Sequence, residues 1–306
     1  MRQDFRTDEL REAIERSCGI GPIGLARLPG RANSLNFVAR PASGDKFVVK
    51  CSPKDHFEGF QRLLAHLDEL EGSKAVRRVH RCAVEKFAHY NVVCLSWCEG
   101  ERLFPDFLSR DELHLFLDDY LRFSHALQKA THVMPPMDPR GNMRHVQEWF
   151  HGPLADRFKA EIAALMRPVD IVYRADRLRV IHGDFHHGNF LFKDGRLAGV
   201  FDLEEFRYGY PADDIVRYFV CAAEHLRWFE LARRTKVTAA FAEAVRYLPY
   251  GRHEWMVAIN GLHLRMLESR AERGYGPLGT FDLRRKSRLY SALREVVEAC
   301  APGGNE

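Results

Sequence analysis

The segment Val180-Ile181-His182-Gly183-Asp184-Phe185-His186-His187-Gly188-Asn189-Phe190-Leu191-Phe192 places an acidic, histidine-rich loop between two apolar runs. A further apolar run, residues 197–201, follows the turn at 193–195 and ends at Asp202. This pattern predicts a strand at 178–181 before the loop and a hairpin formed by 190–192 and 197–201. Asp184, Asn189 and Asp202 then lie at one end of a small rigid frame. Their side chains suit a hard cation and a proton acceptor, which a phosphoryl-transfer site requires.

The spacing of these three residues makes the pattern specific. Asn189 follows Asp184 by five residues, and Asp202 follows Asn189 by thirteen. Protein kinases have a catalytic loop of the form H-x-D followed by Asn, and then a metal-binding Asp. The segment resembles the aminoglycoside phosphotransferase and choline kinase family, small-molecule kinases of the protein-kinase-like fold, with Gly183 where protein kinases usually carry Arg. The continuation GYPADDI at 209–215 is also similar to that family.

The resemblance implies a role for each residue of the pattern. Asp184 is the implied catalytic residue, which accepts or orients the proton of the substrate hydroxyl. Asn189 and Asp202 are the implied ligands of Mg²⁺ bound to the phosphates of ATP. The implied cofactors are therefore ATP and Mg²⁺.

Other residues near this loop are candidates for support or for substrate binding. His182 is interpreted as a framework residue whose ring bonds the loop backbone, and Asp214 resembles the family's acid that supports the catalytic loop. His186 is a candidate for contact with the substrate, as are Glu204 and Glu205 after the metal-binding Asp. Either glutamate is also a candidate ligand for a second ion.

Lys50 ends the short apolar strand Phe47-Val48-Val49-Lys50. A lysine at the end of a strand is usually a solvated edge residue. The resemblance instead implies that Lys50 reaches the phosphates of ATP, as the equivalent kinase lysine does. The family also has a Glu on the following helix that pairs with this lysine. Residues 57–70 have the periodicity of an amphipathic helix, on which Glu58 is the nearest acid and Glu69 a second candidate.

Two further segments are expected to bind the nucleotide. The turn between strands 24–28 and 35–40 contains Gly30, Asn33 and Ser34, and small residues allow backbone amides to approach a phosphate. An ordinary hairpin turn is the alternative, and the order Asn-Ser is reversed from the family's usual order. In kinase-like folds the adenine edge binds the backbone of the hinge, which implies contacts at 95–98, including Leu95 and Trp97.

The order of the segments predicts an α+β protein with two lobes. Strand-like segments dominate up to residue 97, and helical periodicity dominates from residue 98 onward. Ser109 and Glu112 have the spacing of a capping box that opens a helix. The predicted domains are therefore a nucleotide-binding lobe at 1–97, with a small antiparallel sheet, and a larger, mainly helical catalytic and substrate-binding lobe at 98–306.

Composition limits the location and the partners of the chain. The net charge of +4 over 306 residues is too small to indicate nucleic-acid binding. The seven cysteines, an odd number without regular spacing, favour reduced thiols. The N-terminus has no apolar signal segment, and no apolar run reaches the length of a membrane span. These features predict a cytoplasmic protein that binds neither nucleic acid nor membrane; its oligomeric state stays open.

Three alternative functions make different demands on the sequence. A metallophosphoesterase requires an Asp-x-His triplet before the loop and a His after Gly-Asn, whereas here Phe190 follows Gly188-Asn189. A P-loop kinase is excluded because the chain has no GxxxxGK[ST] motif. A catalytically inactive kinase-like binding module usually lacks the base, a metal ligand or the strand lysine, and all of these are present.

The acceptor is expected to be a hydroxyl group of a small molecule, such as a sugar, an amino alcohol or an antibiotic-like compound. No Ala-Pro-Glu segment follows Asp202, which disfavours a protein substrate. Residues 215–306 hold fifteen Lys and Arg against ten Asp and Glu. This balance disfavours polycationic aminoglycosides and leaves room for a neutral or anionic acceptor.

Overall fold

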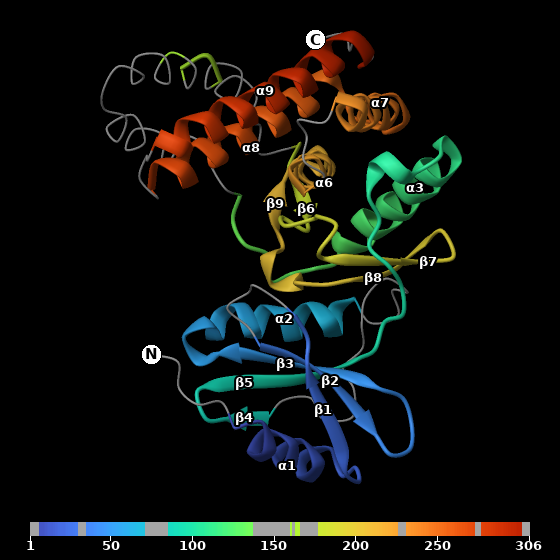
Figure 1. The fold of residues 1–306 in the computed structure, drawn as a ribbon, viewed down its shortest axis with the longest axis vertical. Coiled ribbons are helices and arrows are strands. Elements are labelled where there is room, and N and C mark those ends of the chain that lie inside the picture. Colours follow the sequence, from blue (N-terminus) through green and yellow to red (C-terminus); the bar gives the residue numbers. More distant parts are fainter. Residues whose placement is uncertain are drawn as a thin grey trace.

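Five antiparallel strands form one sheet in the N-terminal part of the chain (Figure 1). The computed structural model describes residues 6–29, 35–70, 85–136, 160, 163–165, 177–225, 231–272 and 277–301. The strands are β1 (Ile23–Arg27), β2 (Leu35–Pro41), β3 (Phe47–Pro53), β4 (Glu85–Phe87) and β5 (Tyr90–Ser96), in the order β1-β2-β3-β5-β4. This sheet and the helices that follow it confirm the predicted α+β fold.

The two faces of the sheet differ: one packs in an apolar cluster and the other lines a cavity. Alternate side chains of β3 point to opposite faces. Phe47, Val49 and Cys51 point to one face and belong to an apolar cluster with residues of α1 (Thr7–Cys18). Val48 and Lys50 therefore point to the opposite face, where both line a cavity. Figure 1 shows α1 and α2 on opposite sides of the sheet.

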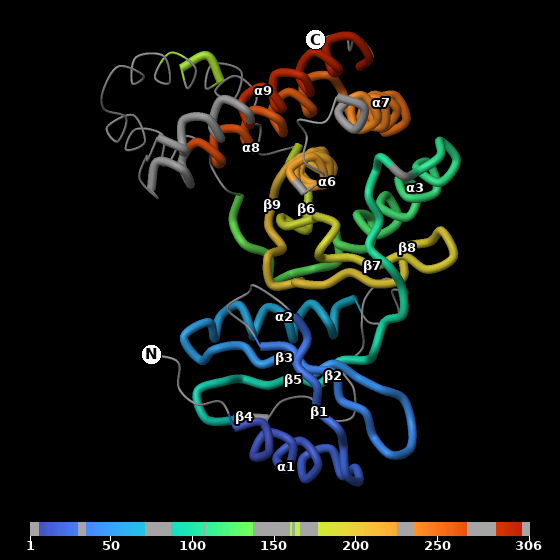
Figure 2. Tube along the Cα trace, in the orientation of Figure 1, coloured from blue at the N-terminus to red at the C-terminus, as the bar shows by residue number. Residues whose placement is uncertain are grey.

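Helix α2 (Phe57–Glu69) lies between the sheet and the C-terminal part of the chain (Figure 2). Phe60, Leu63 and Leu67 are spaced for one helix face and are buried in the main hydrophobic core. That core also contains residues of the later helices, so α2 joins the two parts of the molecule. Glu58, at the start of the helix, is exposed.

The C-terminal part is mainly helical. Its described helices include α3 (Arg110–Leu127), α6 (Pro211–His225), α7 (Leu231–Tyr247), α8 (Arg252–Glu272) and α9 (Pro277–Cys300). The predicted capping box is present at α3, where the side chains and backbone amides of Ser109 and Glu112 bond reciprocally. Helix α1, by contrast, begins at Thr7, and Arg6 at its N-cap position makes no side-chain cap bond.

Two short antiparallel strand pairs carry the loop at 182–189. β6 (Arg179–Ile181) pairs with β9 (Arg207–Gly209), and β7 (Phe190–Lys193) pairs with β8 (Arg196–Val200). The β7–β8 hairpin confirms the prediction from the apolar runs. β9 was not predicted, since three residues carry too little pattern.

The structure also bears on the predicted absence of membrane spans and on the predicted reduced state of the cysteines. Among the described residues, no helix combines the length and the apolar character needed to cross a membrane. Five cysteines of the described residues are free thiols: Cys51, Cys94, Cys98, Cys221 and Cys300. Cys18 is disulfide-bonded, so the expectation of reduced thiols is wrong at that position.

Candidate active site

The β6–β9 and β7–β8 pairs bring the three predicted oxygen-bearing residues together. Asp184 follows β6, Asn189 precedes β7, and Asp202 follows β8. Nδ2 of Asn189 donates to Oδ2 of Asp184 at 3.0 Å and to its carbonyl oxygen at 3.0 Å. Asp202 adopts left-handed backbone angles, with φ of 55°, immediately before the turn at 203–205. The strand-loop-hairpin frame therefore fixes the loop by its own hydrogen bonds.

His182 lies beneath the loop, where it is fully buried. Nδ1 accepts a hydrogen bond from the backbone N–H of Asp184 at 3.2 Å, and Nε2 donates to the carbonyl of Phe201 at 2.7 Å. This pair of bonds requires the neutral ring with its proton on Nε2. Burial lowers the pKa of His182 to about 4, which agrees with that state. His182 thus links the Asp184 loop to the residue before Asp202.

Asp214, on α6, supports the same loop from the other side. Its carboxylate accepts hydrogen bonds from the backbone N–H groups of His182 at 2.8 Å and Gly183 at 2.9 Å. Burial raises the pKa of Asp214 to about 7, although the two N–H groups favour the ionised form. Gly183 has φ of 80°, and a Cβ there would lie 2.5 Å from the carbonyl oxygen of Glu205. Only glycine fits this position without a shift of the backbone.

The carboxylate of Asp184 is bonded on both oxygens. Nε of Arg217 donates to Oδ1 at 2.8 Å, and Nη2 of the same guanidinium donates to that oxygen as well. Nε2 of His186 lies 3.4 Å from Oδ2. Burial alone opposes ionisation, but His186 and Arg217 hold the pKa of Asp184 well below its usual range. Asp184 is therefore a carboxylate at every ordinary pH.

Asn189 and Asp202 present the donors expected of a magnesium site. Because Nδ2 of Asn189 is committed to Asp184, its Oδ1 remains available as a ligand, and both Asn189 and Asp202 line one cavity. Oε2 of Glu204 is buried and has no hydrogen-bond partner among the described residues. Within the described part of the chain, no three His, Cys, Asp or Glu side chains form a metal cluster. An amide, a carboxylate and phosphate oxygens are the mixed donor set that Mg²⁺ accepts, so the residues fit this ion.

Lys50 is paired with two acids, neither of them the one predicted. Its Nζ donates to Oδ1 of Asp202 at 3.0 Å and to Oε1 of Glu204 at 2.6 Å. The predicted partner Glu58 is exposed, because the register that buries Phe60 turns residue 58 outward. Glu69, the second candidate, instead accepts a hydrogen bond from the backbone N–H of residue 131 at 3.0 Å. Burial opposes the charge of Lys50, but Glu204 and Asp202 raise its pKa above the ordinary value.

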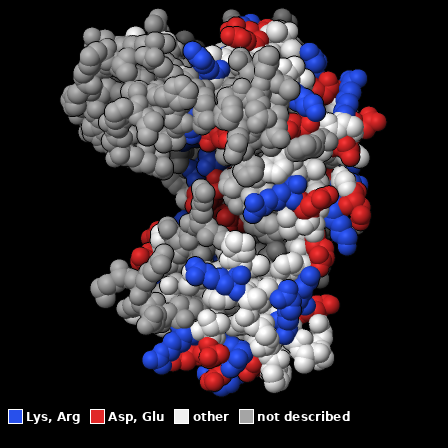
Figure 3. All heavy atoms as spheres, in the orientation of Figure 1, with Lys and Arg blue, Asp and Glu red and all other residues white. Residues whose placement is uncertain are grey.

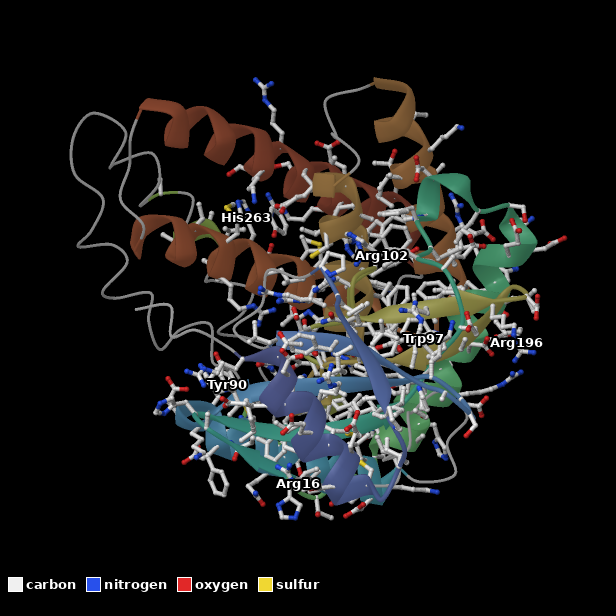
Figure 4. All side chains as sticks on the ribbon, turned by 60° about the horizontal axis from the view of Figure 1, so that its bottom comes forward. Arg16, Tyr90, Trp97, Arg102, Arg196 and His263 are labelled. Atoms are coloured by element: carbon white, nitrogen blue, oxygen red, sulfur yellow. The ribbon has the colours of Figure 1, made fainter. Side chains whose placement is uncertain are left out.

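A cavity of about 400 Å³ lies between the sheet and the β7–β8 hairpin. It is lined by Lys50, Asn189 and Asp202, by apolar side chains such as Val48, and by the hinge residues Leu95 and Trp97, the latter labelled in Figure 4. Charged and amide side chains and apolar side chains thus line the same cavity, which suits a nucleotide. The turn residues predicted to touch phosphate, Gly30, Asn33 and Ser34, lie outside the described residues.

A second cavity, of about 710 Å³, adjoins the first and shares Asp202 with it. Asp184, Glu204 and Glu205 line it together with residues at the start of α2 such as Glu58. Glu205 is paired with Arg207 at 2.7 Å. In the view of Figure 3 both acidic and basic side chains are visible where the sheet-bearing and helical parts meet. Asp184 therefore faces a space outside the first cavity, which we call the nucleotide cavity after its predicted ligand.

Arg217 also contacts Asp184 but was not predicted from the sequence. It lies on α6, three residues after Asp214, and so on the same face of the helix. Asp214 was predicted to support the catalytic loop, and residue 217 lies about one helical turn further along the same face. The helical period could therefore have predicted that residue 217 lies beside that loop.

The comparisons with known proteins agree with this geometry. A family model described as "Phosphotransferase enzyme family" (APH) matches residues 24–255. A search of curated proteins finds no match. Among solved structures, a Ralstonia eutropha protein assigned to the aminoglycoside phosphotransferases has a TM-score of 0.60 and 14% identity, and the alignment covers 97% of this chain and 100% of that one.

Two further structures, both in ligand complexes, have the same fold. Amicoumacin kinase hAmiN, in complex with AMP-PNP, Ca²⁺ and Ami, has a TM-score of 0.58 and 10% identity, with 95% of this chain and 94% of that chain covered. Aminoglycoside phosphotransferase APH(3'')-Id from Streptomyces rimosus, in complex with ADP and streptomycin, has a TM-score of 0.55 and 18% identity, with 86% and 99% covered. At such identities the likeness shows the protein-kinase-like fold. The match of the family model over most of the chain shows the family: the chain belongs to the APH phosphotransferase enzyme family, as its catalytic-loop pattern predicted.

Proposed function

We propose that this small-molecule kinase transfers the γ-phosphoryl group of ATP to a hydroxyl group of its acceptor, with Mg²⁺ as the metal cofactor. The observation that carries the proposal is the pair of adjoining cavities. One holds Lys50 and Asn189, the other opens onto Asp184, and Asp202 lines both. A phosphoryl group between the two cavities lies next to the catalytic carboxylate. Two of the structures described above are complexes with a nucleotide and a small molecule, which supports the same arrangement here.

In the reaction, the acceptor oxygen forms a bond to the γ-phosphorus as the bond from that phosphorus to the β–γ bridging oxygen breaks. The hydroxyl proton passes to Asp184 and then to water, and ADP leaves. The depressed pKa of Asp184 makes the carboxylate a weak base. We infer that it chiefly orients the hydroxyl and takes the proton late, as suits a loose transition state.

Lys50 supplies positive charge to the phosphates of ATP. It is buried to 6% exposure and fixed by two carboxylates, so its ammonium group is held in place before the nucleotide binds. Asn189 and Asp202 would hold the metal ion, with Glu204 as a candidate for a second one. When bound, that ion neutralises phosphate charge. On this proposal Lys50, Asn189 and Asp202 bind the nucleotide and its metal ion, and Asp184 binds the hydroxyl group of the acceptor.

The acceptor is a small molecule on this proposal, because the cavity beside Asp184 measures about 710 Å³. Cavities of this size accommodate ligands of drug or metabolite dimensions. Sugars, amino alcohols and antibiotic-like molecules are the classes to examine.

The test is a panel of hydroxyl acceptors assayed by ADP release with Mg-ATP, including aminoglycosides, choline, ethanolamine, homoserine, thiamine and sugars. We expect at least one member to raise ADP formation above the rate without acceptor, and chelation of Mg²⁺ by EDTA to abolish that rise. Binding of Mg-ATP without acceptor-dependent ADP formation across the panel and its extensions would instead favour the inactive binding module.

A further inference from the structure

Helix α2 contacts the turn at 203–205 through three residues on one face. Gly59, Arg62 and His66 recur at intervals of three and four residues, so they lie in a row along the helix. A Cβ on Gly59 would lie 3.9 Å from Cβ of Glu204, so the helix backbone itself approaches the turn. At the other end of the row, Nδ1 of the buried His66 donates to the carbonyl of the first residue of the turn at 2.7 Å. Arg62 lies between these two contacts.

Arg62 fixes the backbone of Glu204. Its Nε donates to the carbonyl oxygen of Glu204 at 3.1 Å. The partner is a peptide group rather than a carboxylate, so the bond holds the course of the chain at residue 204. The turn has only three residues, and such a short segment makes few hydrogen bonds of its own. Its position therefore depends on what packs against it, and Arg62 is part of that packing.

The side chain of the same glutamate holds Lys50. Oε1 of Glu204 accepts a hydrogen bond from Nζ of Lys50 at 2.6 Å, a closer contact than the 3.0 Å to Asp202. The other carboxylate oxygen of Glu204 has no hydrogen-bond partner among the described residues. One hydrogen bond and the backbone therefore set where this side chain lies. Arg62, Glu204 and Lys50 thus form a series of two contacts that links α2 to β3.

The polar contacts of α2 with Lys50 are indirect. Every residue of α2 is described, and the hydrogen-bond and ion-pair partners of Lys50 are Asp202 and Glu204, not a residue of the helix. Arg62 lines the second cavity and not the nucleotide cavity. An effect of Arg62 on nucleotide binding therefore has to pass through the turn.

We propose that Arg62 is a positioning residue for nucleotide binding. Its bond to the carbonyl of Glu204 fixes the turn at 203–205, and Glu204 in turn holds Lys50 where the phosphates of ATP bind. The inference rests on the proposed function and adds a residue of α2 to it. What this helix contributes to Lys50 is then a hydrogen-bond donor to the turn, in place of the acid that was expected on the helix.

Two variants at position 62 separate the hydrogen bond from the charge. In Arg62→Gln the amide nitrogen is attached to Cδ, as Nε is in arginine, so it can donate to the same carbonyl without a positive charge. In Arg62→Met no donor stands at that position. Arg40→Met, which removes an exposed arginine of β2, is the matched control. Cooperative thermal unfolding of each variant is checked first. Arg62→Lys, which has a methylene in place of Nε, replaces Arg62→Met if that variant does not fold.

The first test measures the affinity for AMP-PNP with Mg²⁺ by calorimetric titration, which needs no identified acceptor. We expect a Kd about three- to tenfold higher in Arg62→Met, as for one lost hydrogen bond, and wild-type affinity in Arg62→Gln and Arg40→Met. Wild-type affinity in Arg62→Met overturns the inference. An equal loss in Arg62→Met and Arg62→Gln overturns it as well, since the charge of Arg62 then acts rather than its bond to the turn.

The second test is a double-mutant cycle between residues 62 and 204. Glu204→Ala removes the side chain that links the turn to Lys50. If Arg62 acts through Glu204, Arg62→Met should raise the Kd by less than about twofold in that background. Losses that multiply show that the two residues act independently, as they would if Arg62 touched the nucleotide, and they overturn the inference.

A third measurement is independent of nucleotide binding. Lys50 is only 6% exposed, so its amine should react slowly with a labelling reagent while Glu204 holds it in place. At one fixed pH and without nucleotide, we expect mass spectrometry to show labelling of Lys50 at least about twofold faster in Arg62→Met than in the wild type or Arg62→Gln. Equal rates overturn the inference. Failure of the wild type to bind AMP-PNP with Mg²⁺ counts against the proposed function, and the labelling rates then still decide the role of Arg62.

Discussion

Lys50 and Asp184 are the two charged centres of the site, and they are held in different ways. The Lys50 side chain is 7% exposed and has two carboxylates from one short loop as partners. The Asp184 side chain is 27% exposed, and its partners come from the catalytic loop and from α6. The lysine is enclosed by the fold, whereas the carboxylate is presented to a cavity.

The difference follows from what each group must do. Lys50 has to stay charged and in place for each nucleotide, so burial between acids suits it. In the proposed reaction Asp184 has to meet the acceptor, so a position at the wall of the second cavity suits it better. Changes at the two centres should therefore separate: those at Asp184 affect turnover but leave nucleotide binding intact, and those at Lys50 affect both.

The largest effect is expected for Asp184→Asn. The amide keeps the shape of the side chain but cannot accept the hydroxyl proton, so kcat should fall by about 10²–10⁴-fold. Nucleotide affinity, measured by titration with AMP-PNP, should stay close to the wild type, whereas the lost ion pair with Arg217 should lower the thermal midpoint. A variant that keeps more than about a tenth of the wild-type turnover contradicts the role given to Asp184, since that loss lies below the general-base range.

The second-largest effect is expected for Lys50→Met, which should lower both turnover and stability. The apolar side chain leaves Asp202 and Glu204 facing one another without their cation, which should lower the free energy of unfolding by about 1–3 kcal/mol. In addition, kcat/KM for ATP should fall by about 10- to 100-fold, as expected for a lost charged contact. Lys54→Met, at an exposed position after the same strand, is the matched control and should change neither quantity. Equal behaviour of the two variants contradicts the enclosed role of Lys50.

The same comparison shows where sequence patterns carried the prediction. The positions of Asp184, Asn189 and Asp202 follow from a local pattern, a strand, a loop and a hairpin, whose residues lie within about two dozen positions of one another. Lys50 follows from the end of an apolar strand once that loop is recognised. The capping box at Ser109 is also a local pattern. The fold class follows from the order of many such local patterns along the chain.

The partners of these residues were harder to predict, because they depend on packing between distant segments. Glu204 is 154 residues from Lys50 in the chain, and only the docking of α2 against the turn at 203–205 brings them together. Glu58 was chosen by proximity in sequence, but the buried stripe of α2 turns it outward. The position of Arg217, by contrast, could have been predicted from the helical period, because it lies three residues after Asp214 on α6. The roles assigned to the site residues remain predictions, as does the lobe boundary at residue 97.

Glu204→Gln tests the pairing directly, with a smaller effect expected. Glutamine keeps the size of the side chain and removes the negative charge nearest to Lys50, so KM for ATP should rise by about three- to tenfold. The pKa of Lys50, which Glu204 raises, should fall, so amine labelling of Lys50 should begin at a lower pH. Glu58→Gln is the matched control on α2. If Glu58→Gln changes KM and labelling as Glu204→Gln does, the predicted family pairing applies in solution after all.

The smallest effect concerns the stability of the fold and its dependence on pH, and it arises from the buried side chain of His182. Burial lowers the pKa of His182 to about 4, from an ordinary value of 6.5. Below pH 6.5 the unfolded chain gains a proton on His182 that the folded chain refuses until about pH 4. Stability from the neutral ring is thus complete above pH 6.5 and declines as the pH falls toward 4, by about 3 kcal/mol at most.

His182→Gln isolates this effect, since the amide can still donate to the carbonyl of Phe201 but does not titrate. Denaturant unfolding of both proteins at several pH values gives the difference in free energy, in which the titration of Asp184 and Asp214 largely cancels because both proteins share those groups. We expect the wild-type advantage to be constant above pH 6.5 and to shrink steadily below it. A difference that does not change between pH 7 and pH 4.5 means that His182 takes up its proton at the same pH in the folded and the unfolded chain. Burial and the Nδ1 bond to the backbone of Asp184 then do not keep the ring neutral below pH 6.5, and the contact between His182 and the loop does not depend on the neutral ring.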